Sequence, residues 1–174
     1  MQPGRRNSLI LAALGLGAAA AGALVGALAL QSGSGAAQLL SASFSDLQGR
    51  KRRVLEWRGQ VLACNFWATW CAPCLEEVPL LIAAKQQYAA KGFEVIGIGI
   101  DNAAKISDFA AKFRVNYKLL IADADAIELM RQLGNQAGAL PYTVLLDRTG
   151  AIAHRKLGAF RKDELERVLA GLLG

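Results

Sequence analysis

The sequence predicts an α/β domain with a central mixed sheet and helices on both faces. Two apolar runs, 61–67 and 93–100, have the length of strands buried on both faces, and each precedes a segment with helical periodicity. Near the C-terminus, two strand-like runs flank Arg148-Thr149-Gly150, which predicts an antiparallel hairpin. Strands that alternate with helices pair mostly in parallel, so this last hairpin makes the sheet mixed.

The N-terminal segment has the pattern of a membrane anchor. The run from Leu9 to Leu30 contains only apolar and small residues, it follows Arg5 and Arg6, and the first acidic residue is Asp46. About 20 such residues span a bilayer as a helix, and positive charge before the run places the N-terminus in the cytoplasm. We therefore expect a single-pass transmembrane helix in the inner membrane, with the following domain in the periplasm or outside the cell.

The predicted division of the chain is a signal-anchor with its linker over 1–35 and a folded domain over 36–174. The linker is the Ser/Gly/Ala-rich stretch 31–38, which predicts flexibility. The small-residue triplet 27–29 could be a cleavage site, so a cleaved, soluble periplasmic form is the alternative.

The charge of the chain is mildly basic. Of the 20 basic residues, two lie in the first 35, so the remainder carries 18 basic against 14 acidic residues, a net +4. This excess does not indicate binding to nucleic acid. The one dense cluster, 50–53, is expected on a solvated hairpin, with lipid headgroup contact as a minor alternative.

The remaining elements follow from periodicity and from capping residues. Asp101 or Asn102 can cap the helix that follows the second core strand. Pro79 lies inside the helix that follows the cysteine pair and should kink it. The expected order is a β-hairpin within 44–56, strand 61–67, a helix to about 91, strand 93–100, a helix to about 114, strand 118–122, helix 126–133, strands 142–147 and 152–157, and helix 161–173.

The chemistry is expected at Cys71 and Cys74, between the first core strand and the first helix. Free N–H groups and the positive end of the helix dipole favour the thiolate of Cys71, which makes it a nucleophile. Cys74 lies one turn on and can resolve a mixed disulfide. Pro73 fits the first turn, where no N–H partner is lost.

Two other uses of the cysteine pair are less well supported. A structural zinc site needs four ligands, and the chain offers only Cys64 and His154 besides the pair. A purely structural disulfide would close too short a loop to constrain the unfolded chain much. We expect Cys64 to be a buried thiol in the first core strand and His154 to lie on a surface strand.

The stretch from Asn65 to Cys74, with the sequence NFWATWCAPC, resembles the active-site signature of the thioredoxin superfamily, in the form found in membrane-anchored TlpA/ResA-like thiol–disulfide oxidoreductases. The resemblance covers the chain from about 44 to its end. It implies a thioredoxin-like fold with an N-terminal β-hairpin and, over 118–133, a central strand–helix insertion. It also implies a cis peptide bond between Leu140 and Pro141, beside the cysteines. Trp70, Leu140 and Pro141 are then the expected substrate-binding residues.

The site lacks the buried aspartate that thioredoxin has two residues before its first tryptophan. Asn65 stands there and cannot accept a proton at neutral pH. Glu77 lies three residues after Cys74 on the same helix face, and ResA-like proteins have a functional glutamate at this place. We therefore predict that Glu77 exchanges protons with the thiols, the alternative being a solvated side chain like its neighbour Glu76.

The sequence thus predicts an enzyme without cofactor or metal that reduces disulfides of exported, cysteine-containing proteins at Cys71 and Cys74. The resemblance implies a membrane thiol-reducing system as electron donor, and apocytochrome c or copper-site cysteines as targets. One alternative is the same scaffold acting as a disulfide-forming oxidant, since the reduction potential decides direction. Another is a copper-delivery protein using both cysteines and His154, because Cu(I) prefers soft thiolates.

Overall fold

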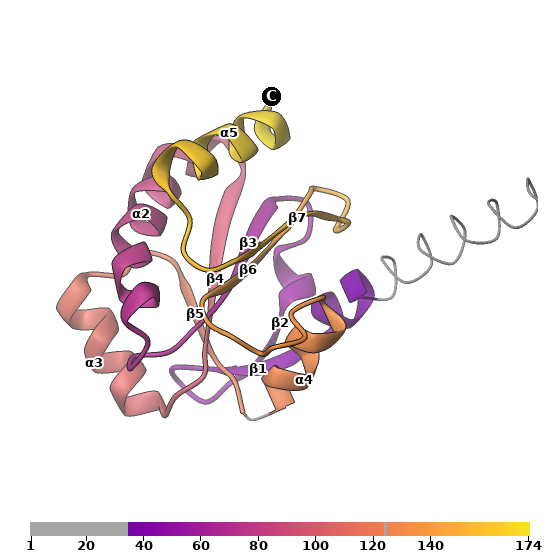
Figure 1. Cartoon of the computed structure of the whole chain (residues 1–174). Helices are drawn as coiled ribbons and strands as arrows, with labels where there is room; N and C mark the ends of the chain where they lie inside the picture. The colour runs from indigo at the N-terminus through magenta and orange to yellow at the C-terminus, as the bar shows by residue number, and fades with distance from the viewer. Residues whose placement is uncertain (1–34, 124) are drawn as a thin grey trace, which may run out of the picture. The chain divides into compact units, whose positions relative to one another are not determined.

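The computed structural model describes residues 35–123 and 125–174 (Figure 1). The predicted membrane anchor lies in 1–34, outside the described residues. Within the described part of the chain, every helix is too short or too polar to cross a bilayer. Residues 35–174 form one compact unit.

The centre of this unit is a mixed seven-stranded sheet with the strand order β2-β1-β5-β4-β3-β6-β7. The three strands β3, β4 and β5 are parallel neighbours, and β6 runs antiparallel to β3. The elements are β1 (Ser43–Asp46), β2 (Lys51–Arg53), η1 (Val54–Trp57), β3 (Val61–Trp67), α2 (Ala72–Tyr88), η2 (Ala89–Lys91), β4 (Phe93–Gly99), α3 (Ala103–Phe113), β5 (Lys118–Ile121), α4 (Asp125–Gln132), β6 (Tyr142–Leu146), β7 (Ile152–Leu157) and α5 (Lys162–Leu173).

The sheet separates two apolar cores, which confirms the prediction of helices on both faces. Helices α2, α3 and α5 cover one face, and α4 covers the other together with the helical residues 35–41 (Figure 1). All residues of β3 and β4 are buried, as their unbroken apolar runs predict for central strands. The strand–helix pair β5 and α4 between α3 and β6 matches the predicted central insertion.

The prediction of a flexible linker over 31–38 is wrong for its described part, because residues 35–41 are helical. Ala36 and Leu39, three residues apart, are buried, and Leu39 belongs to the core on the α4 side of the sheet. This burial stabilises a helix that the composition alone did not indicate.

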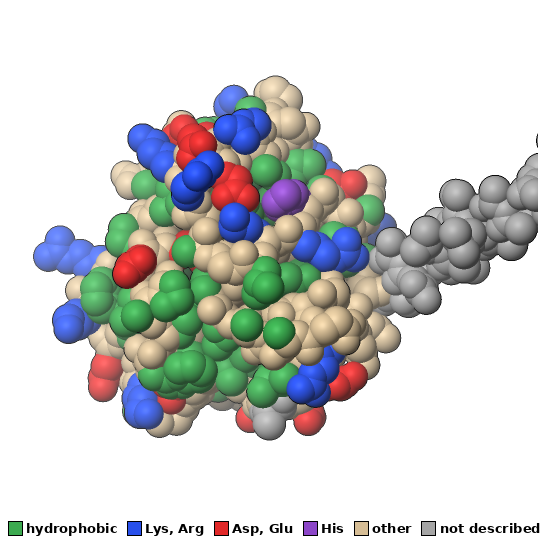
Figure 2. Space-filling view, in the orientation of Figure 1, with side chains coloured by type: hydrophobic (Ala, Val, Ile, Leu, Met, Phe, Trp, Pro, Cys, Tyr) green, Lys and Arg blue, Asp and Glu red, His purple; other side chains and the backbone are tan. Residues whose placement is uncertain are grey.

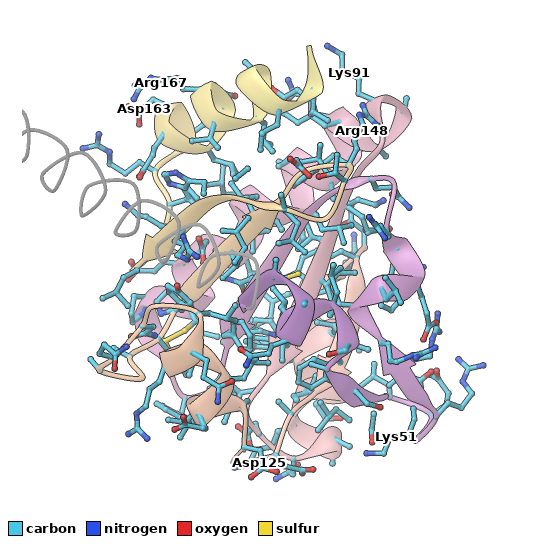
Figure 3. The ribbon with its side chains drawn as sticks, turned by 90° about the vertical axis from the view of Figure 1, so that its right-hand side faces the viewer. Lys51, Lys91, Asp125, Arg148, Asp163 and Arg167 are labelled. Atoms are coloured by element: carbon cyan, nitrogen blue, oxygen red, sulfur yellow. A yellow bond between two sulfur atoms is a disulfide. The ribbon has the colours of Figure 1, made fainter. Side chains whose placement is uncertain are left out.

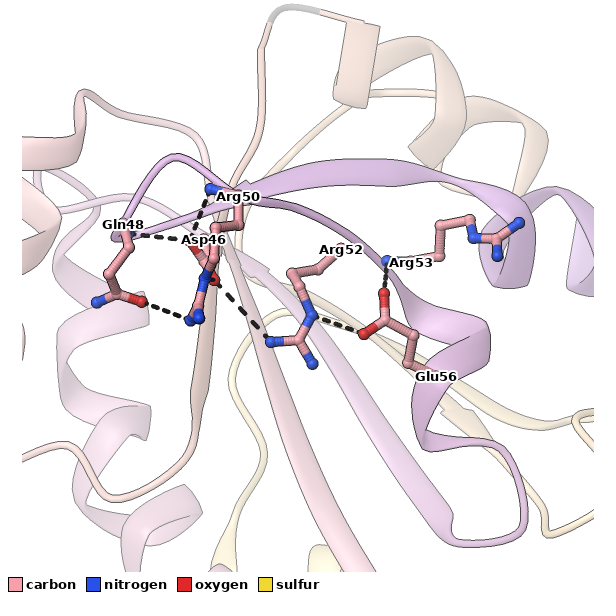
Figure 4. A network of polar contacts seen from close by, with 6 residues as sticks. All are labelled: Asp46, Gln48, Arg50, Arg52, Arg53 and Glu56. Atoms are coloured by element: carbon pink, nitrogen blue, oxygen red, sulfur yellow. Dashed lines mark hydrogen bonds and ion pairs between the residues drawn. The ribbon is translucent and has the colours of Figure 1, made fainter.

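The β1–β2 hairpin confirms the predicted turn around residues 48 and 49, and it orders part of the basic cluster (Figure 4). The buried Asp46 pairs with Nε of Arg50 at 2.8 Å, and Arg52 pairs with Glu56 at 2.6 Å. The guanidinium of Arg52 also lies 4.9 Å from the centre of the Trp57 ring. The cluster is therefore a hairpin surface whose arginines are partly neutralised by Asp46 of the hairpin and Glu56 of η1.

On the face drawn in Figure 2, charged side chains gather over α5 and are also scattered around the rim. Below those over α5, Figure 2 shows a broad group of hydrophobic side chains. Asp163 and Arg167 of α5 pair at 3.5 Å, and Arg148 donates to the carbonyl oxygen of Lys91 at 2.8 Å (labelled in Figure 3). The second contact fixes the β6–β7 turn against the chain segment that enters β4.

Candidate active site

The two cysteines of the predicted motif form a disulfide at the start of α2. Cys71 is the N-cap residue of the helix and Cys74 lies in its first turn, with their Cα atoms 5.2 Å apart. Pro73 occupies the first turn, as predicted, and the helix continues through Pro79. Both cysteines are buried among the residues of the core under α2, so exchange with another protein must take place at the rim of this core.

A short turn before Cys71 connects β3 to the helix. The N–H group of Cys71 donates to the carbonyl oxygen of Ala68 at 3.2 Å. The hydroxyl of Thr69 hydrogen-bonds to the carboxylate of Asp101, which follows β4. The turn is thus fixed both within itself and to the neighbouring strand connection, an anchor that the sequence analysis did not identify.

The peptide bond between Leu140 and Pro141 is cis, as predicted. Tyr142 is paired with Phe66 in the β3–β6 register, so Pro141 lies level with the end of β3, where the cysteine-bearing turn begins. Leu140 packs against the core that contains both cysteines. Trp70 is 68 % exposed and is the most exposed large apolar side chain in the described part of the protein.

Glu77 is buried, with only 2 % of its surface exposed. Its Oε2 accepts a hydrogen bond from Nδ2 of Asn65 at 3.0 Å, and its Oε1 accepts one from the backbone N–H of Phe160 at 2.9 Å. Burial raises the pKa of Glu77, and these two hydrogen bonds oppose the shift without cancelling it. The alternative of a solvated side chain is therefore wrong for Glu77, whereas Glu76 is exposed.

Asn65 links Glu77 to the sheet. Its Nδ2 also donates to Oγ1 of Thr143 at 2.9 Å, on the β6 residue with which it is paired. Because an amide nitrogen carries two protons, Asn65 can satisfy both partners at once. Neither Thr143 nor the Phe160 backbone was identified from the sequence, and only the register of β3 with β6 could have indicated Thr143.

The other two predicted side chains lie apart from this constellation. Cys64 is buried in β3 and unpaired, and burial raises its pKa to about 12, as expected for an inert thiol. His154 lies on the edge strand β7, as expected, where it is half-buried with its ring centre 6.0 Å from that of Phe160. Among residues 35–123 and 125–174, no three His, Cys, Asp or Glu side chains are grouped to hold a metal ion, so this part of the chain does not assemble the ligand set of the copper-delivery alternative.

Comparison with known proteins agrees with this arrangement. The family model described as Redoxin matches residues 35–171. The thiol-disulfide oxidoreductase ResA of Bacillus anthracis is 31% identical over 128 residues, which cover 72% of this chain and 70% of that protein. The ResA of Geobacillus thermodenitrificans (strain NG80-2) is 29% identical over 129 residues, with 74% and 72% covered. The thioredoxin-like protein YneN of Bacillus subtilis (strain 168) is 30% identical over 131 residues, with 73% and 74% covered.

Solved structures show the same fold. A thiol:disulfide interchange protein of the thioredoxin family from Chlorobium tepidum TLS aligns with a TM-score of 0.66 and 24% identity, over 77% of this chain and 94% of that one. A secreted thiol-disulfide isomerase from Corynebacterium glutamicum aligns with a TM-score of 0.68 and 25% identity, over 78% and 84%. The chain therefore belongs to the Redoxin family within the thioredoxin superfamily, and it is a ResA-like thiol–disulfide oxidoreductase.

Proposed function

We propose that the protein works in the reducing direction, opening disulfides in exported partner proteins with Cys71 as the nucleophile. The observation that carries the exchange chemistry is the buried, hydrogen-bonded Glu77, which gives the cysteine pair a carboxylate close to its own helix turn, while the direction is decided by the reduction potential. The position of Cys71 as the N-cap residue supports its role, because the helix terminus favours its thiolate.

The reaction is a dithiol–disulfide exchange. The Cys71 thiolate attacks one sulfur of the partner disulfide, and the other partner sulfur leaves as a thiolate that takes up a proton. Cys74 loses its proton and attacks Cys71 in the mixed disulfide, which restores the Cys71–Cys74 disulfide and releases the second partner thiol. Two electrons pass to the partner, so a thiol reductant must then reduce the protein again.

Glu77 is the proposed acceptor for the proton of Cys74. A carboxylate with a raised pKa holds a proton closer to neutral pH, where it can exchange it with a thiol. The two residues are three positions apart on α2, so their side chains lie on one helix face. Asn65 cannot take this role itself, and we assign it to holding Glu77.

The substrate segment is proposed to bind at Trp70, Leu140 and Pro141. Trp70 offers a large exposed apolar surface next to Cys71. Pro141 has no N–H group, so the backbone of Leu140 can pair with an extended chain by adding a short strand. Such pairing recognises main chain rather than sequence, which suits a protein that reduces more than one partner.

We also propose that the protein is anchored in the inner membrane by the segment within 1–35, with the catalytic domain in the periplasm or outside the cell. The apolar run after Arg5 and Arg6 supports this topology. A membrane thiol-reducing system is then the proposed electron donor, and the cysteines of apocytochrome c or of copper sites are the proposed substrates.

Two measurements test the direction of the exchange reaction and the separate roles of Cys71 and Cys74. The reduction potential of the Cys71–Cys74 pair should lie near that of thioredoxin, about −270 mV, and a value near the −120 mV of DsbA would favour the oxidant instead. Cys74→Ser should trap a mixed disulfide through Cys71, whereas Cys71→Ser should trap none. Equal trapping by both variants would contradict the assigned roles.

A further inference from the structure

We propose, on the basis of the proton-acceptor role given to Glu77 above, that Tyr117 is a positioning residue for that carboxylate, with its hydroxyl turned toward Glu77 and favouring the charged form. Tyr117 precedes β5, and no step of the reaction described above uses it. It is buried within the core under α2 that also contains both cysteines.

Gly97 brings Tyr117 next to the site. In the β3–β4 register Gly97 is paired with Asn65, which donates to Glu77. A Cβ atom on Gly97 would lie 2.8 Å from Cδ2 of Leu119, 3.0 Å from Cε2 of Tyr117 and 3.2 Å from Nε1 of Trp67. The Tyr117 ring therefore shares with Leu119 and Trp67 the space that glycine leaves open, beside the residue that holds Glu77.

The hydroxyl of Tyr117 is buried without a hydrogen-bond partner in the described part of the protein. A buried polar atom of this kind calls for a reason, since most are paired. Burial and then the negative charge of Glu77 raise the pKa of Tyr117, so the two groups interact and the hydroxyl stays protonated. Its hydrogen rotates about the C–O bond, and an O–H dipole directed at a buried carboxylate stabilises the anion.

The charged groups around Glu77 and Tyr117 oppose one another. Lys156 of β7 lowers the pKa of Glu77 and Glu164 of α5 raises it, and the two pair with each other at 2.8 Å. On its outer side Tyr117 borders a surface cavity of about 230 Å³ together with Asp46, Arg50, Arg52 and Lys118. The Tyr117 hydroxyl is thus a neutral group on the β5 side of Glu77, whereas the charges of Lys156 and Glu164 come from β7 and α5.

The test is Tyr117→Phe in the oxidised full-length protein, in which Cys71 and Cys74 are bonded and do not titrate. The ¹³C resonance of the Glu77 carboxyl carbon is followed against pH and is identified by its absence in Glu77→Gln. Loss of the hydroxyl should raise the pKa of Glu77 by about half a unit or more, a roughly threefold tighter hold on the proton. An unchanged or lowered value would overturn the proposal.

Tyr142→Phe is the matched control. Tyr142 packs in the core on the other face of the sheet, and its hydroxyl donates to the carbonyl oxygen of Leu133 at 2.6 Å. This variant should leave the pKa of Glu77 unchanged, and an equal shift in both variants would also overturn the proposal. If Tyr117→Phe shifts the pKa but Glu77→Gln leaves thiol exchange unaltered, the link between Tyr117 and Glu77 stands and the proton-acceptor role fails.

Discussion

Two carboxyl groups flank the turn that bears Cys71, and their pKa values shift in opposite directions. Glu77 accepts hydrogen bonds from two neutral N–H groups, and burial raises its pKa. Asp101 accepts from the Thr69 hydroxyl and from the N–H of Asn102, and Lys105 lies 3.4 Å away. Burial opposes ionisation of Asp101 as well, but there the hydrogen bonds and the lysine outweigh it and lower the pKa.

The comparison shows that hydrogen bonds to both oxygens do not by themselves decide whether a carboxyl group is charged. Both oxygens of both groups have donors, so the difference lies chiefly in depth, and Lys105 adds a smaller contribution at Asp101. Asp101 therefore stays charged and anchors the turn through Thr69. The raised pKa of Glu77 brings its protonation closer to neutral pH, which favours exchange with a thiol.

Glu77→Gln should have the largest effect. It keeps the size of the side chain but removes the proton acceptor, so resolution of a mixed disulfide by Cys74 should slow by about 10²-fold near neutral pH. Stopped-flow measurement of product release checks this. Glu76→Gln is the control because Glu76 is exposed on the same helix. An equal slowing in both variants would show that a general charge effect, rather than proton transfer by Glu77, is responsible.

Asn65→Ala should lower the free energy of unfolding by about 1–3 kcal/mol, because it leaves Glu77 and Thr143 without a shared donor. Urea unfolding at neutral pH measures the change. Asn116→Ala provides the comparison, since that amide donates to a backbone carbonyl at an exposed position. A loss no larger than that of Asn116→Ala would mean that Asn65 does not hold the network together.

The pH dependence of stability should separate the two carboxyl groups. The pKa of Glu77 is raised on folding, so its favourable contribution is complete below the ordinary value of 4.5 and is lost as the pH rises through the folded pKa. The pKa of Asp101 is lowered, so its contribution is present above the ordinary value of 3.8 and is lost as the pH falls through the folded pKa.

Unfolding free energies measured across both ranges, from about pH 2 to pH 8, test this contrast, at about 1.4 kcal/mol for each unit of pKa shift. Glu77→Gln should remove the loss of stability that occurs as the pH rises above 4.5. Asp101→Asn should remove the loss of stability that occurs as the pH falls below 3.8. If the two variants flatten the same side, the opposite shifts are wrong.

Lys105→Ala should have the smallest effect, a loss of about 0.3–0.5 kcal/mol, because Lys105 is an exposed i,i+4 partner of Asp101. Urea unfolding in low salt measures it, and added salt should reduce the difference. A loss above about 1 kcal/mol would show that the lysine, rather than the hydrogen bonds from Thr69 and Asn102, keeps Asp101 charged.

Elements with a strong local pattern were predictable from the sequence. The two apolar runs gave β3 and β4, and Asn102 caps α3 by accepting from the N–H of Lys105, as its residue type predicts. Residues 35–41 could not be predicted as a helix, because what stabilises them is the burial of Ala36 and Leu39 against distant parts of the chain.

The active site likewise combines residues that a local pattern relates with residues that only the fold brings together. Cys71, Cys74 and Glu77 lie within seven consecutive residues, so helix geometry alone relates them. The partners of the Glu77 network, Thr143 and the N–H of Phe160, are 78 and 83 residues away from the groups they contact. Their place depends on the register of β6 and on the loop before α5, which no local pattern specifies.

Cys64 is a built-in probe for opening of the sheet. Burial raises the pKa of the Cys64 thiol to about 12, so this thiol stays protonated at pH 7 in the folded protein. The strands β4 and β6 enclose it on both sides, so an alkylating reagent reaches it only when the sheet separates. In the oxidised protein Cys64 is the one cysteine outside the disulfide, so its rate of alkylation reports opening of the sheet around β3 without an added probe.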